Sequence, residues 1–122
     1  MSLDMYSEII LDHFKNPHNF VRLEGADAHA KDNNPSCGDE VEIFLKVKDG
    51  KVSEVKFEGR GCAISQASAS MLTDAINGMK VLDVSKLDGK FVTNLLGVEL
   101  SPMRLKCAYL SAGVLKQAIA LK

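Results

Sequence analysis

Three cysteines are the residues of this chain with the clearest chemistry, and each stands at a predicted junction between elements. Cys37 lies in a turn-rich loop before a predicted strand, Cys62 lies between a predicted strand and a helix, and Cys107 lies near the start of the last predicted helix. The thiolate form of cysteine is both a nucleophile and a metal ligand. Because a helix N-terminus carries partial positive charge, we expect the thiolates of Cys62 and Cys107 to be favoured. We also expect none of the three cysteines to lie in the middle of the core.

The tripeptide Cys37-Gly38-Asp39 adds a carboxylate to these thiols. In an extended segment, residues i and i+2 point to the same face, and the glycine between them lets the loop close around one ion. With Cys62 and Cys107, this makes three sulfur donors and one oxygen donor, which suits tetrahedral zinc or a thiolate-bound iron-sulfur cluster. The alternative is that the cysteines are small buried apolar side chains and that Asp39 caps a turn. No Cys-x-x-Cys pair decides between them, so the spacing alone leaves both open.

Two glycines and two histidines are interpreted as structural residues rather than as ligands. Gly59 and Gly61 precede Cys62 without the Lys-Ser or Lys-Thr of a phosphate-binding loop, so we expect them to let the backbone turn beside the cysteine. His13 and His18 lie within and just after a predicted helix, and we interpret them as surface or capping groups rather than as ligands.

The composition limits the class of protein. A chain of 122 residues, 46% of them hydrophobic, is long enough for one domain over 1–122 with a core that needs no disulfides. Fifteen basic against sixteen acidic residues indicate no nucleic-acid partner. Three cysteines cannot all pair within the chain, which favours the reduced thiols of the cytoplasm. No apolar run approaches the roughly 18 residues that span a bilayer, so we expect no membrane association.

Hydrophobic periodicity predicts the elements that position these groups. A first helix over 3–14 has an apolar stripe and ends before Asn16-Pro17. Alternating side chains predict strands over 41–48 and 54–58, joined as an antiparallel hairpin by Asp49-Gly50. A weaker alternation places a third strand within 26–31. The stripe of the first helix consists of Leu3, Tyr6, Ile9, Ile10 and Phe14.

The second half of the chain is predicted to be helical. A helix over 63–77 ends at Gly78, and shorter helices follow over 81–87 and 91–96. Ser101-Pro102 marks the approach to a last helix. These elements predict an α+β fold, in which helices pack on one face of a small three-stranded antiparallel sheet. The apolar stripe of the last helix consists of Leu105, Ala108, Tyr109, Ala112, Leu115 and Ile119.

Four blocks of the sequence resemble the iron-sulfur cluster assembly scaffold family, which comprises IscU, SufU and the N-terminal domain of NifU. The blocks follow the family's order and run over nearly the whole chain. The resemblance implies the family's fold, a small antiparallel sheet covered by helices on one side. The blocks are residues 6–19 (YSEIILDHFKNPHN), 34–39 (NPSCGD), 57–65 (FEGRGCAIS) with 67–70 (ASAS), and 105–108 (LKCA).

The resemblance implies an acceptor of sulfur rather than a stand-alone enzyme. Its members receive persulfide sulfur from a cysteine desulfurase, and in the IscU branch they build a [2Fe-2S] cluster that passes to acceptor proteins. Cys37, Cys62 and Cys107 occupy the family's three cysteine positions, and Asp39 occupies its aspartate position. The resemblance therefore implies these four residues as ligands, with Cys37 and Cys107 as the candidate sulfur acceptors.

The residue before the third cysteine bears on the branch. Lys106 stands where the IscU branch has a histidine, and an ammonium group cannot ligate a metal at neutral pH, so this position is similar to SufU. The extra segment that SufU proteins usually carry between the second and third cysteines is not found here. Three interpretations stay open. The first is a [2Fe-2S] scaffold with Cys107 as the first acceptor, in which Lys106 stabilises a persulfide anion. The second is a zinc-dependent sulfurtransferase with Cys37 as the acceptor, and the third is a zinc-stabilised adaptor without sulfur chemistry.

Overall fold

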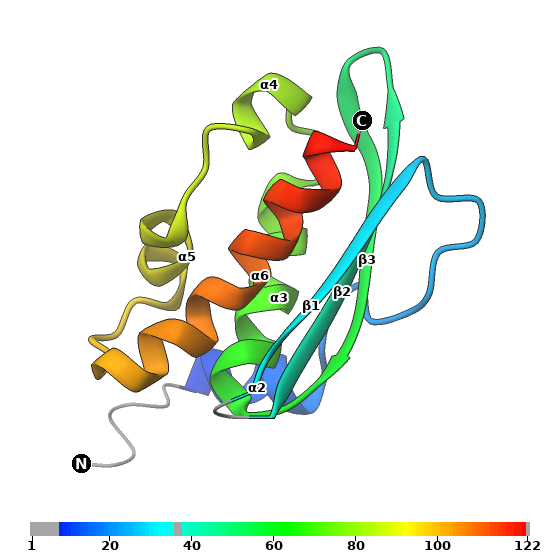
Figure 1. Cartoon of the computed structure of the whole chain (residues 1–122). Helices are drawn as coiled ribbons and strands as arrows, with labels where there is room; N and C mark the ends of the chain where they lie inside the picture. The colour runs from blue at the N-terminus through cyan, green and yellow to red at the C-terminus, as the bar shows by residue number, and fades with distance from the viewer. Residues whose placement is uncertain (1–7, 36–37, 122) are drawn as a thin grey trace.

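Helices cover one face of a three-stranded antiparallel sheet, which confirms the predicted α+β class (Figure 1). The computed structural model describes residues 8–35 and 38–121. Within these residues, no helix combines the length and the apolar character needed to cross a membrane. The elements are α2 (Glu8–Lys15), β1 (Ala28–Asn34), β2 (Asp39–Lys48), β3 (Lys51–Arg60), α3 (Ala63–Ile76), α4 (Val81–Val84), α5 (Gly89–Leu96) and α6 (Pro102–Ala120).

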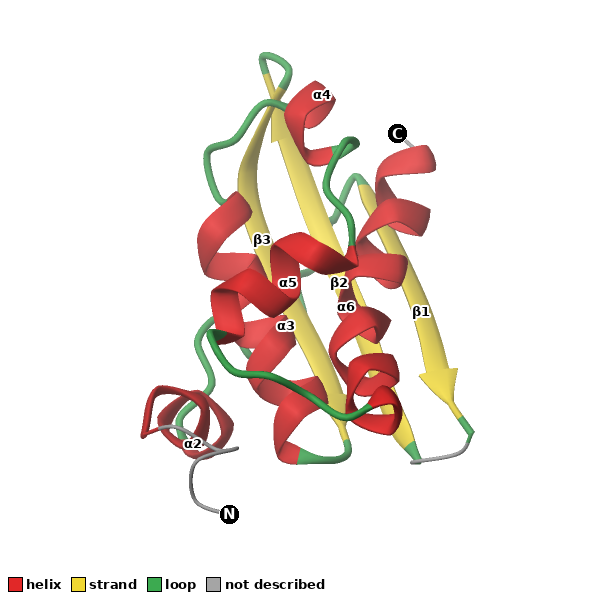
Figure 2. Cartoon of the chain, turned by 90° about the vertical axis from the view of Figure 1, so that its left-hand side faces the viewer, coloured by secondary structure: helices red, strands yellow, loops and turns green. Residues whose placement is uncertain are grey.

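The sheet has the order β1-β2-β3, and its register brings three chain segments to one end. Asp49 and Gly50 both have positive φ, as the predicted tight hairpin between β2 and β3 requires. The third strand lies at Ala28–Asn34, further along the chain than its weak alternation predicted, and Asn34 pairs with Asp39. Glu40 pairs with Arg60, the last residue of β3. The end of β1, the start of β2 and the end of β3 therefore lie together, beside the start of α3 (Figure 2).

The core lies between the sheet and two helices, α3 and α6. Fully buried side chains of β2 and β3, including Ile43 and Phe57, face the helices, and Leu72 of α3 and Leu115 of α6 complete the layer. Each such side chain contributes roughly 1.5–3 kcal/mol through removal of its apolar surface from water. The predicted ends of α3 and α5 are confirmed within one or two residues, and Gly78 has the expected positive φ.

The stripe predicted for the first helix is only partly buried. Helix α2 ends at Lys15, just before Asn16-Pro17 as predicted. Ile10 is buried, but Ile9 is 60% exposed and Phe14 is exposed, so the prediction for those two side chains is wrong. The reason is that α2 packs mainly against α3, which covers only a narrow strip of this short helix. Leu3 and Tyr6 lie outside the described residues.

The later helices also depart from their predicted limits. The predicted helix over 81–87 is a single turn that ends at Val84. Helix α6 begins at Pro102, because the hydroxyl of Ser101 accepts a hydrogen bond from the backbone N–H of Arg104 at 3.4 Å. Tyr109, predicted to be in the buried stripe, is exposed. The buried face of α6 includes small residues such as Ser111 and Ala118, which allow the helix to pack closely against its neighbours.

Candidate metal centre

Asp39, Cys62 and Cys107 come together from three different elements. Asp39 is the first residue of β2, Cys62 is the N-cap of α3, and Cys107 lies in α6. One donor atom from each residue lies within 4.8 Å of the other two. Cys37 lies outside the described residues, although Gly38 next to it donates its N–H to the carbonyl of Asn34 at 2.9 Å and so holds the turn into Asp39.

The carboxylate of Asp39 is completely buried. Its Oδ1 accepts a hydrogen bond of 2.8 Å from the backbone N–H of Cys62, at the positive end of α3. The thiol of Cys62 donates to Oδ2 over 3.8 Å. Among the described residues, no lysine, arginine or histidine forms an ion pair with Asp39. A buried carboxylate is costly without a compensating positive charge, so an oxygen donor beside two sulfurs fits a thiophilic cation.

Gly61 allows the backbone before Cys62 to lie against Asp39. It has a φ of 138°, and a Cβ atom at this position would collide with Oδ1 of Asp39. A Cβ on Gly59 would likewise collide with the main-chain oxygen of Glu40. The predicted turn is confirmed at Gly61, whereas Gly59 lies within β3 and instead allows the close approach to β2.

The two described cysteines have different surroundings. Cys62 is half-buried at the N-cap of α3, as predicted. Cys107 is fully buried and belongs to the core cluster, so the prediction that no cysteine lies in the core is wrong for it. Since α6 begins at Pro102, Cys107 lies in the second turn, where the helix N-terminus has little effect. Its thiol donates to the carbonyl of Met103 over 3.7 Å.

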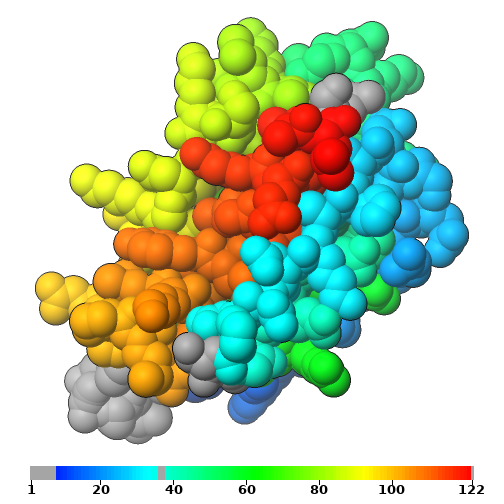
Figure 3. All heavy atoms as spheres, viewed as in Figure 1, coloured from blue at the N-terminus to red at the C-terminus, as the bar shows by residue number. Residues whose placement is uncertain are grey.

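Lys106 lies beside the three donors rather than among them. It is exposed on α6 and lines a pocket of 320 Å³ together with Asn33, Asn34 and Pro35, the residues that lead towards Cys37. In the space-filling view, β1 (cyan) and α6 (orange to red) lie against one another along this face (Figure 3). Its ammonium group is thus placed next to the loop of the first cysteine.

Sequence reasoning missed a second group of neighbouring side chains, formed by His13, His18 and Asp74. The only sequence signal was two histidines on either side of the Asn16-Pro17 turn. Asp74 is more than fifty residues away in the chain and carried no signal of its own.

A family model and several known proteins match nearly the whole chain. The family model of the NifU-like N terminal domain matches residues 5–121. IscU 1 of Archaeoglobus fulgidus, an iron-sulfur cluster assembly scaffold protein, is 37% identical over 115 residues, which cover 94% of this chain and 74% of that protein. The zinc-dependent sulfurtransferase SufU of Bacillus subtilis is 40% identical over 134 residues, which cover 95% and 90%.

Solved structures of proteins from the same family have the same fold as this chain. The crystal structure of FiSufU from Fervidobacterium islandicum AW-1 matches with a TM-score of 0.82 and 33% identity, and it covers 98% of this chain and 99% of that one. A NifU-like N-terminal structure from Brucella abortus, at 21% identity and a TM-score of 0.77, has the same fold. The chain therefore belongs to the NifU-like N-terminal domain family, to which the family model assigns residues 5–121.

Proposed function

We propose that this chain accepts sulfur from a cysteine desulfurase and assembles or relays it as a [2Fe-2S] cluster on Cys37, Asp39, Cys62 and Cys107. The observation that carries the proposal is the convergence of three of these donors within 4.8 Å around a buried carboxylate. The names of the relatives support it, since most are iron-sulfur cluster assembly scaffolds. The partners are then a desulfurase and the proteins that receive the cluster.

We expect Cys37 rather than Cys107 to take sulfur first. Its described neighbours Pro35 and Gly38 are exposed, whereas Cys107 is fully buried. The Cys37 thiolate attacks the outer sulfur of the desulfurase persulfide, the S–S bond of the donor breaks, and the donor cysteine leaves as a thiolate. Lys106, beside the loop of Cys37, supplies a positive charge for the persulfide anion.

The mixed donor set suits transient holding of a cluster. Thiolates are strong ligands for iron, whereas the harder oxygen of Asp39 is a weaker partner in a sulfur-rich site. An assembly site of this kind holds its cargo through the cysteines and releases it at the aspartate.

A second candidate function is a zinc-dependent sulfurtransferase. Lys106 in place of a ligating histidine favours it, as does the 40% identity to SufU. The same four residues would hold the zinc ion, which would keep the cysteines deprotonated and stabilise the fold.

Metal and sulfide analysis separates these candidates. The chain is purified without added metal and then incubated anaerobically with a desulfurase, L-cysteine, ferrous iron and a thiol reductant, which supplies the electrons that reduce persulfide sulfur to sulfide. The scaffold function predicts bound iron and acid-labile sulfide in equal amounts, lost in Cys62→Ser and kept in Asp49→Asn, a control in the exposed hairpin turn. Retained zinc with no sulfide, together with faster alanine release, would favour the sulfurtransferase. Unchanged alanine release would favour the adaptor without sulfur chemistry. The cytoplasmic location and the single domain over 1–122 stay predictions.

A further inference from the structure

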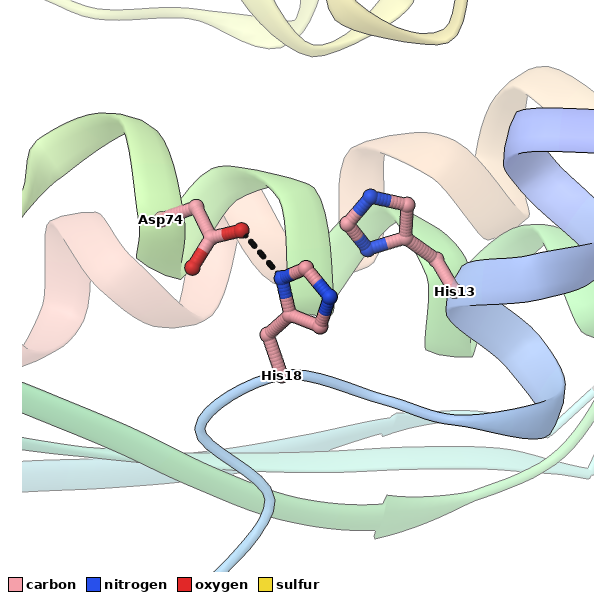
Figure 4. A group of neighbouring side chains, drawn as sticks. All are labelled: His13, His18 and Asp74. Carbon is pink, nitrogen blue, oxygen red and sulfur yellow. Dashed lines mark hydrogen bonds and ion pairs between the residues drawn. The ribbon is translucent and has the colours of Figure 1, made fainter.

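A second group of side chains that could bind a metal ion consists of His13, His18 and Asp74 (Figure 4). His13 comes from α2, His18 from the loop that follows, and Asp74 from α3. One donor atom of each lies within 4.8 Å of the other two. Asp74 is twelve residues beyond Cys62 on α3, which at 1.5 Å per residue separates the two sites by about 18 Å along the helix.

Hydrogen bonds hold these side chains in place. Nδ1 of His18 lies 2.5 Å from Oδ2 of Asp74, and Asn19 donates its side-chain N–H to Oδ1 of the same carboxylate at 2.9 Å. Nδ1 of His13 lies 2.7 Å from the hydroxyl of Ser70. The two imidazole rings are neighbours, with centroids 4.5 Å apart (Figure 4). Histidine ligands in metal sites are commonly oriented by such a partner on the ring.

The donor set points to a particular class of ion. Two imidazoles and one carboxylate are ligands that Zn²⁺ and similar first-row divalent ions take, whereas Mg²⁺ and Ca²⁺ prefer all-oxygen sites. Burial, and next the charge of His18, lower the pKa of His13, while Asp74 and Asp12 act in the opposite direction. A neutral ring is the form that binds a metal.

We propose that His13, His18 and Asp74 form a surface site for Zn²⁺ that is independent of the cysteine site. Ligands of a tetrahedral zinc ion lie about 3.4 Å from one another, so donor atoms that are up to 4.8 Å apart need to approach by at most about 1.4 Å. This movement is available because the side chains of His18 and Asp74 are 48% and 45% exposed. Their exposure also leaves the remaining coordination position to water.

The site would add a further link between α2, its following loop and α3. Helix α2 packs mainly on α3, hydrogen bonds already join the loop to Ser70 and Asp74, and the proposed ligands come from these same three segments. An ion bound only by the folded chain raises stability by mass action. Zinc at this site therefore stabilises the packing of α2 against α3. The competing account is a hydrogen-bonded His18–Asp74 pair that binds no ion.

Zinc titration followed by NMR of the histidine rings tests the proposal on the whole chain. His29 is the third histidine and lies on β1 beside Glu42 and the ring of Phe44, outside the group of His13, His18 and Asp74, so its ring is an internal control. We expect the ring signals of His13 and His18 to shift with micromolar zinc while those of His29 stay in place. This readout does not depend on whether the cysteines hold zinc or a cluster. His18→Gln and Asp74→Asn should each weaken this binding at least about tenfold, and His29→Gln should leave it unchanged.

Thermal unfolding supplies a second measurement. Zinc beyond the amount bound by the cysteines should raise the Tm of the wild type and of His29→Gln, but not that of His18→Gln. Two results would overturn the proposal: His13 and His18 signals that stay unmoved up to about 1 mM zinc, or equal zinc affinity in the wild type, His18→Gln and Asp74→Asn.

Discussion

Oδ1 of Asp39 accepts a hydrogen bond of 2.8 Å from the backbone N–H of Cys62. This contact joins the first residue of β2 to the N-cap of α3, two points 23 residues apart. It fixes an otherwise costly buried carboxylate next to a thiol. The geometry of the candidate metal centre therefore depends on the contact between the sheet and α3, and not only on the loop that carries Cys37.

Asp39→Asn should slow release of a bound cluster. The amide oxygen keeps the hydrogen bond from Cys62, but the weakly held anionic ligand is lost, so the cluster can no longer leave through carboxylate dissociation. We expect transfer to an apo-ferredoxin to slow by about tenfold, a barrier ~1.4 kcal/mol higher. Transfer is followed by the visible absorbance of the acceptor. Asp49→Asn should transfer at the wild-type rate, and equal rates for both variants would contradict this role for Asp39.

Gly61→Ala should destabilise the fold and the site together. The new Cβ collides with Asp39, and the φ of 138° is unfavourable for alanine, so a loss of about 2–3 kcal/mol is expected in urea denaturation. Gly25→Ala is the matched control, because Gly25 also has positive φ but no neighbouring atom within 4 Å. That variant should lose only about 1 kcal/mol and keep its metal binding. Losses of the same size in both variants would argue against the close approach.

Lys106→Ala should slow sulfur transfer without changing stability. The ammonium group is exposed next to the loop of Cys37, where one favourable charge interaction contributes about 1 kcal/mol, or about fivefold in rate. Lys116→Ala removes an exposed lysine from the same helix and serves as the control. The measurement is the rate of persulfide formation with desulfurase and L-cysteine. An unchanged rate in Lys106→Ala would remove the electrostatic role.

Ser111→Ala should stabilise the protein. The hydroxyl of Ser111 is buried one turn after Cys107, and no hydrogen-bond partner for it is found among the described residues. Removing an unsatisfied buried hydroxyl is expected to raise the free energy of unfolding by about 1 kcal/mol. Urea denaturation of the metal-free protein measures this, and a lower stability in Ser111→Ala would show that the hydroxyl has a partner.

Local signals predicted most of the fold. The Asp49-Gly50 turn and the flanking alternation specified the hairpin, and Gly78 marked the end of α3. The extent of β1 was not predictable, because its residues beyond Lys31 are polar and are held by pairing with β2 rather than by burial. Burial along α2 failed for a similar reason, since a tertiary contact with α3 decides which side chains are covered.

The residues of the candidate site could be predicted from the sequence, but their burial and their positions relative to one another could not. Spacing alone left Asp39 and the cysteines with two interpretations, and the resemblance to the scaffold family favoured one of them. The depth of Cys107 depends on where α6 begins, and the Ser101 cap sets this start at Pro102, three residues before the first residue of the predicted apolar stripe, Leu105. The group of His13, His18 and Asp74 exists only through the packing of α2 on α3, so no local pattern contained it.

Trapping of the persulfide shows whether Cys37 accepts sulfur from the desulfurase. The chain is incubated anaerobically with a desulfurase and L-cysteine, the thiols are alkylated, and peptide mass spectrometry locates the added sulfur. We predict one additional sulfur on the peptide that contains Cys37 in the wild type and in Ser36→Ala, and none at that position in Cys37→Ser. A wild-type chain without added sulfur, or a Cys37→Ser chain that accepts sulfur as fast as the wild type, would contradict it.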